Sequence, residues 1–471
     1  MSTTEQHQRS APVPEVQARP GPVLLRWTAV AFVAVLIGAS CAVLYGWGNG
    51  LELKRLALLV AVPAGAASVA VAVRRFEWFL LGLIALRPGL DLFHQSGGAL
   101  DPATMVGAVF VLAAGGWLYV QWRTGPWVSP SLATWALGVF VAMAAASTLT
   151  SQSVLTSATA TVRVLAGALI FAVLEQLLAN RPDRARRMLL AVLASAAVPL
   201  VLAAMQIVRG DNSSYCTNGC GLDVSRVTGT FVHPNPFATY LAIVVVMIVA
   251  LVPLATGWQR VALVLYGGTV GTVLIFTYAR GAWLAVLVGL GYLVARRRRE
   301  LLLVLAAGLV VVVLAVPSVR NRFADLSAPP PVAGVPSNSL SWRIGYWQTV
   351  LPLADRDPIN GIGLGMVEKT MQLPPHNIYV QAYTETGVFG LAALLGLIFA
   401  MGSTLRRRSR MARGRLEQAL AAASVAIALG LLVQSVSENL IDQTMAYWYF
   451  AAAGLWGLTN LTGAARRFER S

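Results

Sequence analysis

A single histidine lies in the segment with the highest density of polar side chains in the chain. His376 follows two prolines in the segment PPHNIYVQAYTETGVFG, and Asn377, Tyr379 and Glu385 follow it closely. A free imidazole titrates near about pH 6.5, so it can accept a proton at neutral pH. Two interpretations of His376 are therefore open: a general base, and a histidine that caps a helix or packs in a core.

Four arginines lie at the expected outer ends of apolar segments or in the loop beside them: Arg163, Arg226, Arg280 and Arg343. A guanidinium binds phosphate or diphosphate oxygens in a two-pronged geometry and stays charged. A single arginine at a membrane edge could instead extend its head group to water or pair with an acid. Several arginines on one face would suit a lipid-linked diphosphate.

Other common signatures of chemistry are absent from the sequence. It contains no GxxxxGK[ST] phosphate loop, no GxGxxG segment after a strand and no HExxH motif. Asp355 and Asp357 resemble a metal-binding pair, but Arg356 between them and Pro358 after them favour a loop turn. We therefore predict no cofactor, no metal ion and no use of cytoplasmic ATP.

The elements that position these residues must be membrane-spanning helices. Hydrophobic residues make up 57% of the 471 residues and charged residues only 12%, against roughly 25% charged in soluble domains. A transmembrane helix needs about 17–25 mostly apolar residues. The sequence predicts an all-α polytopic integral membrane protein with about 12–14 transmembrane helices. The candidates are 27–46, 56–73, 77–92, 103–121, 131–149, 160–179, 187–208, 235–256, 259–278, 280–295, 301–317, 386–404, 416–437 and 443–463.

The charge distribution predicts which side each loop faces. We take the N-terminus as cytoplasmic and let the loops alternate sides. The excess basic residues that give the net charge of +16 then all lie on the cytoplasmic side, and the external face is neutral on balance. The high basicity therefore indicates membrane topology, and nucleic acid is not an expected partner. Both termini are expected in the cytoplasm, with His376 on the opposite side.

The predicted organisation has five regions: a disordered cytoplasmic tail (1–22), N-terminal transmembrane helices (23–208), a central transmembrane region with an external cysteine loop (209–317), a long external loop with short helices (318–385), and C-terminal transmembrane helices with a basic cytoplasmic tail (386–471). In the cysteine loop, a disulfide between Cys216 and Cys220 is favoured over two free thiols.

In the long loop, residues 341–351 have apolar positions at helical spacing. This helix is expected either to lie at the membrane interface, anchored by Trp342, Tyr346 and Trp347, or to pack on a small core within the loop.

Three segments resemble the O-antigen ligase and Wzy-type polymerase superfamily. They are RVTGTFVHPNPFATYL from Arg226, YARGAWL around Arg280, and PHNIYVQAYTETGVFG around His376. Arg343 with Trp347, followed by PINGIGLG, also resembles the region that precedes the histidine in this family. Together these segments cover about residues 225–400.

The resemblance implies a fold like that of class C glycosyltransferases and an enzyme of polysaccharide biosynthesis in the cell envelope. Members transfer a glycan from undecaprenyl diphosphate to an acceptor hydroxyl outside the cytoplasm, so the expected location is the bacterial cytoplasmic membrane. The expected partners are the lipid-linked donor, a lipid, glycan or cell-wall acceptor, and membrane lipids. The resemblance implies that Arg226 and Arg280 bind the diphosphate and that His376 is the base or orients the acceptor. We also expect Arg163 and Arg343 to bind the diphosphate and Asn235, Asn377, Tyr379 and Glu385 to support the site.

Two alternatives to an O-antigen ligase are open. A Wzy-type polymerase would share the same pattern and differ in the acceptor. A lipid-linked oligosaccharide flippase would need charges along a central cavity that is reachable from both leaflets, whereas the predicted span interiors here are nearly free of charge. A transferase without metal, which inverts the anomeric centre, is therefore the preferred hypothesis.

Overall fold

The computed structural model describes residues 75–93, 102–179, 181–210, 225–297, 317–324, 339–441 and 443–457, with Ala72, the pair 213–214 and isolated positions between 299 and 314. Several predicted features lie outside these residues: the tail 1–22, the span 27–46 and nearly all of 56–73, the pair Cys216 and Cys220, most of 301–317, and the C-terminal tail. The helices discussed below belong to one unit that begins at Phe76.

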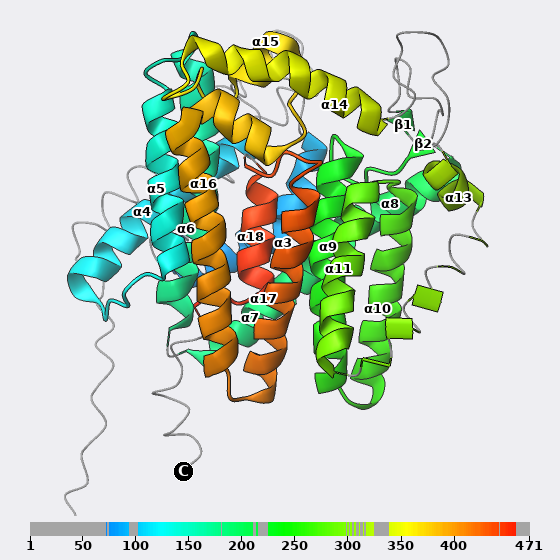
Figure 1. Ribbon diagram of the computed structural model, residues 1–471. Coiled ribbons are helices and arrows are strands. Elements are labelled where there is room, and N and C mark those ends of the chain that lie inside the picture. The colour runs from blue at the N-terminus through cyan, green and yellow to red at the C-terminus, as the bar shows by residue number, and fades with distance from the viewer. Residues whose placement is uncertain are drawn as a thin grey trace, which may run out of the picture. The chain divides into compact units, whose positions relative to one another are not determined.

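The described chain is almost entirely helical, which confirms the predicted all-α class (Figure 1). The α-helices are α3 (Phe76–Leu90), α4 (Pro102–Thr124), α5 (Leu132–Ser147), α6 (Val154–Leu178), α7 (Pro182–Ser195), α8 (Ala197–Arg209), α9 (Pro234–Leu251), α10 (Gly257–Phe276), α11 (Arg280–Arg297), α13 (Pro317–Ala324), α14 (Ser339–Val350), α15 (Met366–Met371), α16 (Ile378–Met411), α17 (Arg415–Gln434) and α18 (Thr444–Ala453). Short 3₁₀ segments are η1 (Asp91–Phe93), η2 (Val252–Leu254) and η4 (Leu351–Arg356), and β1 (Ser213–Ser214) pairs antiparallel with β2 (Ser225–Arg226).

Six helical segments in the described part are long and apolar enough to cross a membrane: Val154–Leu178, Asp183–Arg209, Pro234–Leu254, Gly257–Phe276, Ile378–Met411 and Arg415–Gln434. The protein is therefore a multi-pass membrane protein. The neighbouring predicted spans 259–278 and 280–295 are two separate helices, α10 and α11, because the chain turns at Tyr278, which has a positive φ of 51°.

One predicted span is too long. The segment 443–463 was expected to be helical throughout, but α18 ends at Ala453 and the chain turns through Gly457. Gly457 has a φ of 97°, and a Cβ there would lie 2.6 Å from the carbonyl oxygen of Leu174. The turn therefore requires glycine, and it ends the helix where the chain meets α6.

The helices pack around α9. Nearly every residue of α9 is buried, and its neighbours are α10, α11, α17 and α18. A helix that is apolar on all faces belongs in the core of a bundle. On one flank α16 packs mainly against α5, whereas α17 packs mainly against α11. Figure 1 shows α14 and α15 crossing one end of these helices.

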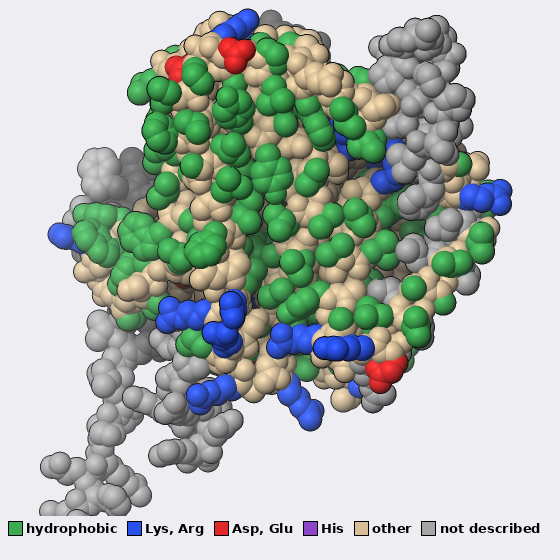
Figure 2. Space-filling view, in the orientation of Figure 1, with side chains coloured by type: hydrophobic (Ala, Val, Ile, Leu, Met, Phe, Trp, Pro, Cys, Tyr) green, Lys and Arg blue, Asp and Glu red, His purple; other side chains and the backbone are tan. Residues whose placement is uncertain are grey.

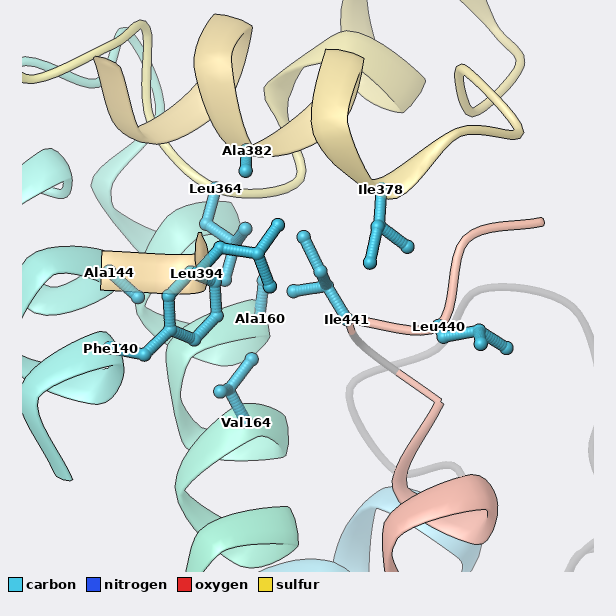
Figure 3. Close-up of a cluster of buried hydrophobic side chains, with 10 residues drawn as sticks. All are labelled: Phe140, Ala144, Ala160, Val164, Leu364, Ile378, Ala382, Leu394, Leu440 and Ile441. Atoms are coloured by element: carbon cyan, nitrogen blue, oxygen red, sulfur yellow. The ribbon is translucent and has the colours of Figure 1, made fainter. Parts of the chain in front are cut away.

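Two apolar clusters hold the crossing segments in place. The helix predicted at 341–351 is present as α14, and it packs on the small core within the loop that one interpretation required: Val350 of α14 joins Ile362, Met366 and Val367. A second cluster joins α5, α6 and α16 to the segments around Leu364 and Ile441 (Figure 3). The start of α16 and the chain after α17 are therefore fixed against each other.

The surface has the distribution that a membrane-spanning bundle requires. Figure 2 shows hydrophobic side chains over the middle of the visible face and Lys and Arg side chains gathered near its lower end. Large apolar side chains such as Leu395 and Phe399 are 51% and 75% exposed on α16. The lower ends of α11, α16 and α17 carry the arginines, among them Arg296, Arg406, Arg410 and Arg415.

Candidate active site

His376 lies at the end of the bundle that α14 and α15 cross, immediately before α16. Its φ is 51°, a left-handed conformation that is uncommon outside glycine and that concentrates at functional sites. The Nε1 of Trp347 donates a hydrogen bond of 2.7 Å to the carbonyl of Pro375. The ring of Trp342 lies edge-on to the imidazole, with 6.2 Å between the ring centroids. Two tryptophans of α14 therefore position His376: Trp347 bonds to the backbone of the preceding residue, and Trp342 contacts the imidazole ring.

Asn377 fastens the same turn to the helix and to a neighbouring segment. Its side chain caps α16 by accepting hydrogen bonds from the backbone N–H groups of Tyr379 and Val380. Its own backbone N–H donates to Oδ1 of Asn439 over 3.1 Å. The N–H of Ile378 donates to the carbonyl of Ser435 over 3.0 Å. The chain that follows α17 is thus bonded directly to the start of α16.

Glu438 is the residue that joins the predicted site residues to one another. It is 6% exposed, and its Oε1 accepts a hydrogen bond of 2.6 Å from Nδ2 of Asn235. The Nη2 of Arg343 lies 3.5 Å from the same Oε1, and Nδ1 of His376 lies 4.0 Å from Oε2. One buried carboxylate therefore faces a guanidinium, an amide and the imidazole.

Arg226 extends this cluster to α9 and α10. Its Nη2 donates 2.6 Å to Oδ1 of Asn235, and its Nε donates 2.7 Å to the carbonyl of Thr277. Arg280 begins α11 three residues after Thr277 and is half-buried. Arg226 and Arg280 thus lie at the same end of the bundle as His376. We call Arg226, Asn235, Arg343, His376 and Glu438 the carboxylate cluster.

The other predicted residues lie outside the carboxylate cluster. Arg163 is exposed on α6, and within the described residues it makes no hydrogen bond or ion pair. Tyr379 is partly buried and packs against the apolar cluster that joins α5, α6 and α16. Glu385 is fully buried and accepts hydrogen bonds of 2.9 Å from the N–H of Val367 and 3.0 Å from Nε2 of Gln381. These contacts fasten the loop to α16.

The environment determines the charge of the two titratable groups at the centre. Burial, and then the nearby Arg343, lower the pKa of His376 to about 4. Burial raises the pKa of Glu438 to about 7, although Arg343, Arg226 and the hydrogen bond from Asn235 oppose the rise. At neutral pH the imidazole is therefore neutral and able to accept a proton. Among the described contacts its Nδ1 has no hydrogen-bond partner.

The acidic pair considered for metal binding has another role. Oδ1 of Asp357 accepts a hydrogen bond of 3.0 Å from the N–H of Asn360, which is the local turn that the sequence favoured. Asp355 lies in η4. Within the described residues no group of three or more His, Cys, Asp or Glu side chains is placed to hold a metal ion.

Glu438 was missed by the sequence reasoning. The available signal was small: a Glu-Asn pair that directly follows the predicted span 416–437, on the side where His376 was expected. A single acid at such a position usually marks only the end of a span. Its proximity to His376 depends on how α16 and α17 pack, which the linear sequence does not reveal.

Residues 261–395 match the family model described as O-antigen ligase, Wzy_C. The match runs from α10 into α16 and contains Arg280, Arg343 and His376, and it confirms the predicted resemblance over this part of the chain. The matched region supports a ligase- or polymerase-type function at the membrane. Arg226 and Glu438 lie outside it. No curated protein is significantly similar in sequence.

Proposed function

We propose that this protein is a glycosyltransferase that moves a glycan from a polyprenyl diphosphate carrier to an acceptor hydroxyl, in the manner of an O-antigen ligase. The observation that carries the proposal is the carboxylate cluster: one arginine, an amide and a neutral imidazole face one buried carboxylate at one end of a membrane-spanning bundle, and a second arginine bonds to the amide. The family match from 261 to 395 supports the same class of chemistry.

The arginines act on the donor. The anomeric carbon is bonded to a diphosphate oxygen, and negative charge grows on that oxygen as the bond breaks. In this proposal Arg343 and Arg280 bind the diphosphate, and Arg226, which bonds to Asn235, adds positive charge to the same site. Guanidinium groups that strengthen their contacts as charge develops stabilise the transition state more than the bound donor.

His376 acts on the acceptor. The hydroxyl oxygen attacks the anomeric carbon from the face opposite the diphosphate, a new C–O bond forms, and the diphosphate leaves with the electrons of the old bond. The hydroxyl proton passes to Nε2 of His376, which is unprotonated because burial lowers its pKa. Attack opposite the leaving group inverts the anomeric configuration.

Glu438 serves as a positioning residue for His376. When its carboxylate faces Nδ1, the imidazole proton is held there, and the lone pair of Nε2 is directed to the acceptor. The present separation of 4.0 Å exceeds a hydrogen bond, and such contacts often shorten only when substrate binds. The ionised carboxylate also stabilises the imidazolium that forms during transfer.

In this proposal the membrane is the bacterial cytoplasmic membrane and the site faces away from the cytoplasm. The support is the position of the basic side chains: Arg296, Arg406 and Arg415 lie at the ends of α11, α16 and α17 that are opposite to His376. Cytoplasmic ends of membrane helices carry the excess of Lys and Arg. The carrier lipid is then undecaprenyl diphosphate, and the acceptor is a lipid, glycan or cell-wall hydroxyl.

The test is transfer by the purified full-length protein in nanodiscs. Undecaprenyl diphosphate glycan is supplied with candidate acceptors in the presence of EDTA, and products are separated by size and analysed for anomeric configuration. We expect an inverted product from the wild type and a rate about 10²–10⁴-fold lower from His376→Ala. A single addition identifies a ligase and a ladder of products identifies a polymerase. Equal rates from both proteins would contradict the proposal.

A further inference from the structure

An apolar groove runs along the flank of the bundle between α16 and α17, separate from the carboxylate cluster. Its volume is about 560 Å³, within the range of about 300–1,000 Å³ that is typical of ligand-binding cavities. Leu394, Met401 and Leu405 of α16 line one side, and Ala428 and Leu432 of α17 line the other. The groove forms because α16 packs mainly on α5 and α17 on α11.

The basic end of this groove carries three arginines. Arg406 and Arg410 lie one turn apart on α16, and Arg296 lies on the last turn of α11. Among the described contacts Arg406 and Arg410 have no ion pair, whereas Arg296 donates a hydrogen bond of 3.2 Å to the hydroxyl of Tyr292. Ser409, between the two arginines of α16, has a buried hydroxyl without a hydrogen-bond partner in the described part.

The opposite end of the groove has no such charge. Ile378, Ser435 and Leu440 line it, whereas the arginines of the carboxylate cluster and Glu438 do not. An amphiphile in the groove is therefore matched by charge at one end only, where the arginines favour a negative head group. Basic pockets between transmembrane helices at the cytoplasmic side bind anionic phospholipid head groups.

We propose that this groove is a binding site for an anionic phospholipid, with the phosphate between Arg296, Arg406 and Arg410 and an acyl chain along α16 and α17. At 1.5 Å per residue, Gly402 lies about 6 Å along the helix from Arg406 and about 12 Å from Arg410. One leaflet of hydrocarbon is about 15 Å thick. Gly402 thus faces the acyl chain. The inference does not depend on glycosyl transfer.

A bound lipid would fill the space between the two segments that carry the proposed active site. Ile378 and Leu440, at the far end of the groove, are each two residues from His376 and Glu438 respectively. A lipid that bridges α16 and α17 is expected to stabilise their packing. The measurable consequence is a higher melting temperature of the whole protein when the lipid is present.

The experiment uses full-length protein delipidated in detergent, with phosphatidylglycerol or phosphatidylcholine added, followed by native mass spectrometry and thermal melting. We expect phosphatidylglycerol to bind at least about tenfold more tightly and to raise the melting temperature by several degrees. The double variant Arg406→Gln with Arg410→Gln should lose this preference. Arg407→Gln is the matched control, because Arg407 is exposed on the same turn but does not line the groove.

A second pair of variants tests the acyl chain. A Cβ on Gly402 would meet no atom within 4 Å, so Gly402→Leu places its side chain in the groove and leaves the helix intact. We expect it to abolish the gain in melting temperature. Gly396→Leu, equally open but outside the groove, should retain it.

Three outcomes would overturn the proposal. The first is equal affinity for phosphatidylglycerol and phosphatidylcholine. The second is a loss of the preference for phosphatidylglycerol in the Arg407→Gln control that is as large as in the double variant. The third is a groove that binds only undecaprenyl phosphate, with phosphatidylglycerol binding unaffected by Gly402→Leu.

Discussion

Replacing Glu438 with glutamine tests the positioning role most sharply. Glutamine keeps an oxygen that can accept the hydrogen bond from Asn235 and the contact with Arg343, so the local structure is expected to persist. The change removes the negative charge and replaces Oε2, which lies 4.0 Å from Nδ1 of His376, with an amide nitrogen that can only donate. The variant therefore keeps the contacts with Asn235 and Arg343 and removes the oxygen and the charge that act on the imidazole.

The expected loss in kcat follows from the charge that the variant removes. Two unit charges at about 4 Å interact by about 4 kcal/mol when the effective dielectric constant is about 20. Each 1.36 kcal/mol of barrier changes the rate about tenfold. Loss of the carboxylate that stabilises the transient imidazolium is thus expected to lower kcat by about 10²–10³.

The pH profile gives a second, independent readout. The ionised form of Glu438 is the active one, and its pKa is raised to about 7. In the wild type kcat should therefore rise as the pH increases through about 7. The pKa of His376, about 4, lies below this range and does not contribute to the rise. In Glu438→Gln the rise near neutral pH should disappear, whereas a merely structural effect would lower the rate equally at every pH.

The assay is initial-rate glycan transfer from undecaprenyl diphosphate glycan between about pH 5 and 9, with melting temperatures measured in parallel. Glu368→Gln is the matched control, because Glu368 is exposed on α15 outside the carboxylate cluster. A Glu438→Gln variant that retains wild-type kcat, or that keeps the same rise with pH, would refute the reasoning.

Three further variants extend these tests. His376→Ala should lower kcat about 10²–10⁴-fold without changing the melting temperature, and unchanged turnover would exclude His376 as the base. Arg280→Lys should raise the KM for the donor about tenfold or more, because a point charge cannot replace the two-pronged guanidinium; a donor titration measures this. Gly387→Ala should lower the free energy of unfolding by about 1–3 kcal/mol or more, because φ is 68° and a Cβ would lie 2.1 Å from the carbonyl oxygen of Ile359. Thermal melting checks it, with Gly396→Ala, at an open helical position, expected to raise the free energy of unfolding by about 0.5–1 kcal/mol.

Helices were the most predictable feature, because long apolar runs determine them locally. The boundaries of α9, α10 and α17 differ from the predicted spans by few residues. The predicted end of the last span, 463, was wrong. The chain turns at Gly457 because it approaches the backbone of α6 there, although the sequence stays apolar. Whether an apolar segment continues as a helix depended there on packing between distant parts of the chain.

The candidate site was predicted in part. His376, Arg226 and Arg343 meet at one end of the bundle, as the polar residues at predicted span ends indicated. Glu438 was not anticipated, because its interaction with His376 links the ends of α16 and α17 across the fold. Arg163 is exposed on α6 outside the carboxylate cluster, and its role in diphosphate binding stays a prediction.

The most direct test of the central claim is a structure of the His376→Ala variant bound to undecaprenyl diphosphate glycan, which that variant should retain without turnover. The account predicts the diphosphate within hydrogen-bonding distance of Arg343 and Arg280, with the anomeric carbon facing the position of the missing imidazole. A diphosphate bound at the arginine-rich end near Arg406, or one that contacts no arginine near Glu438, would contradict it.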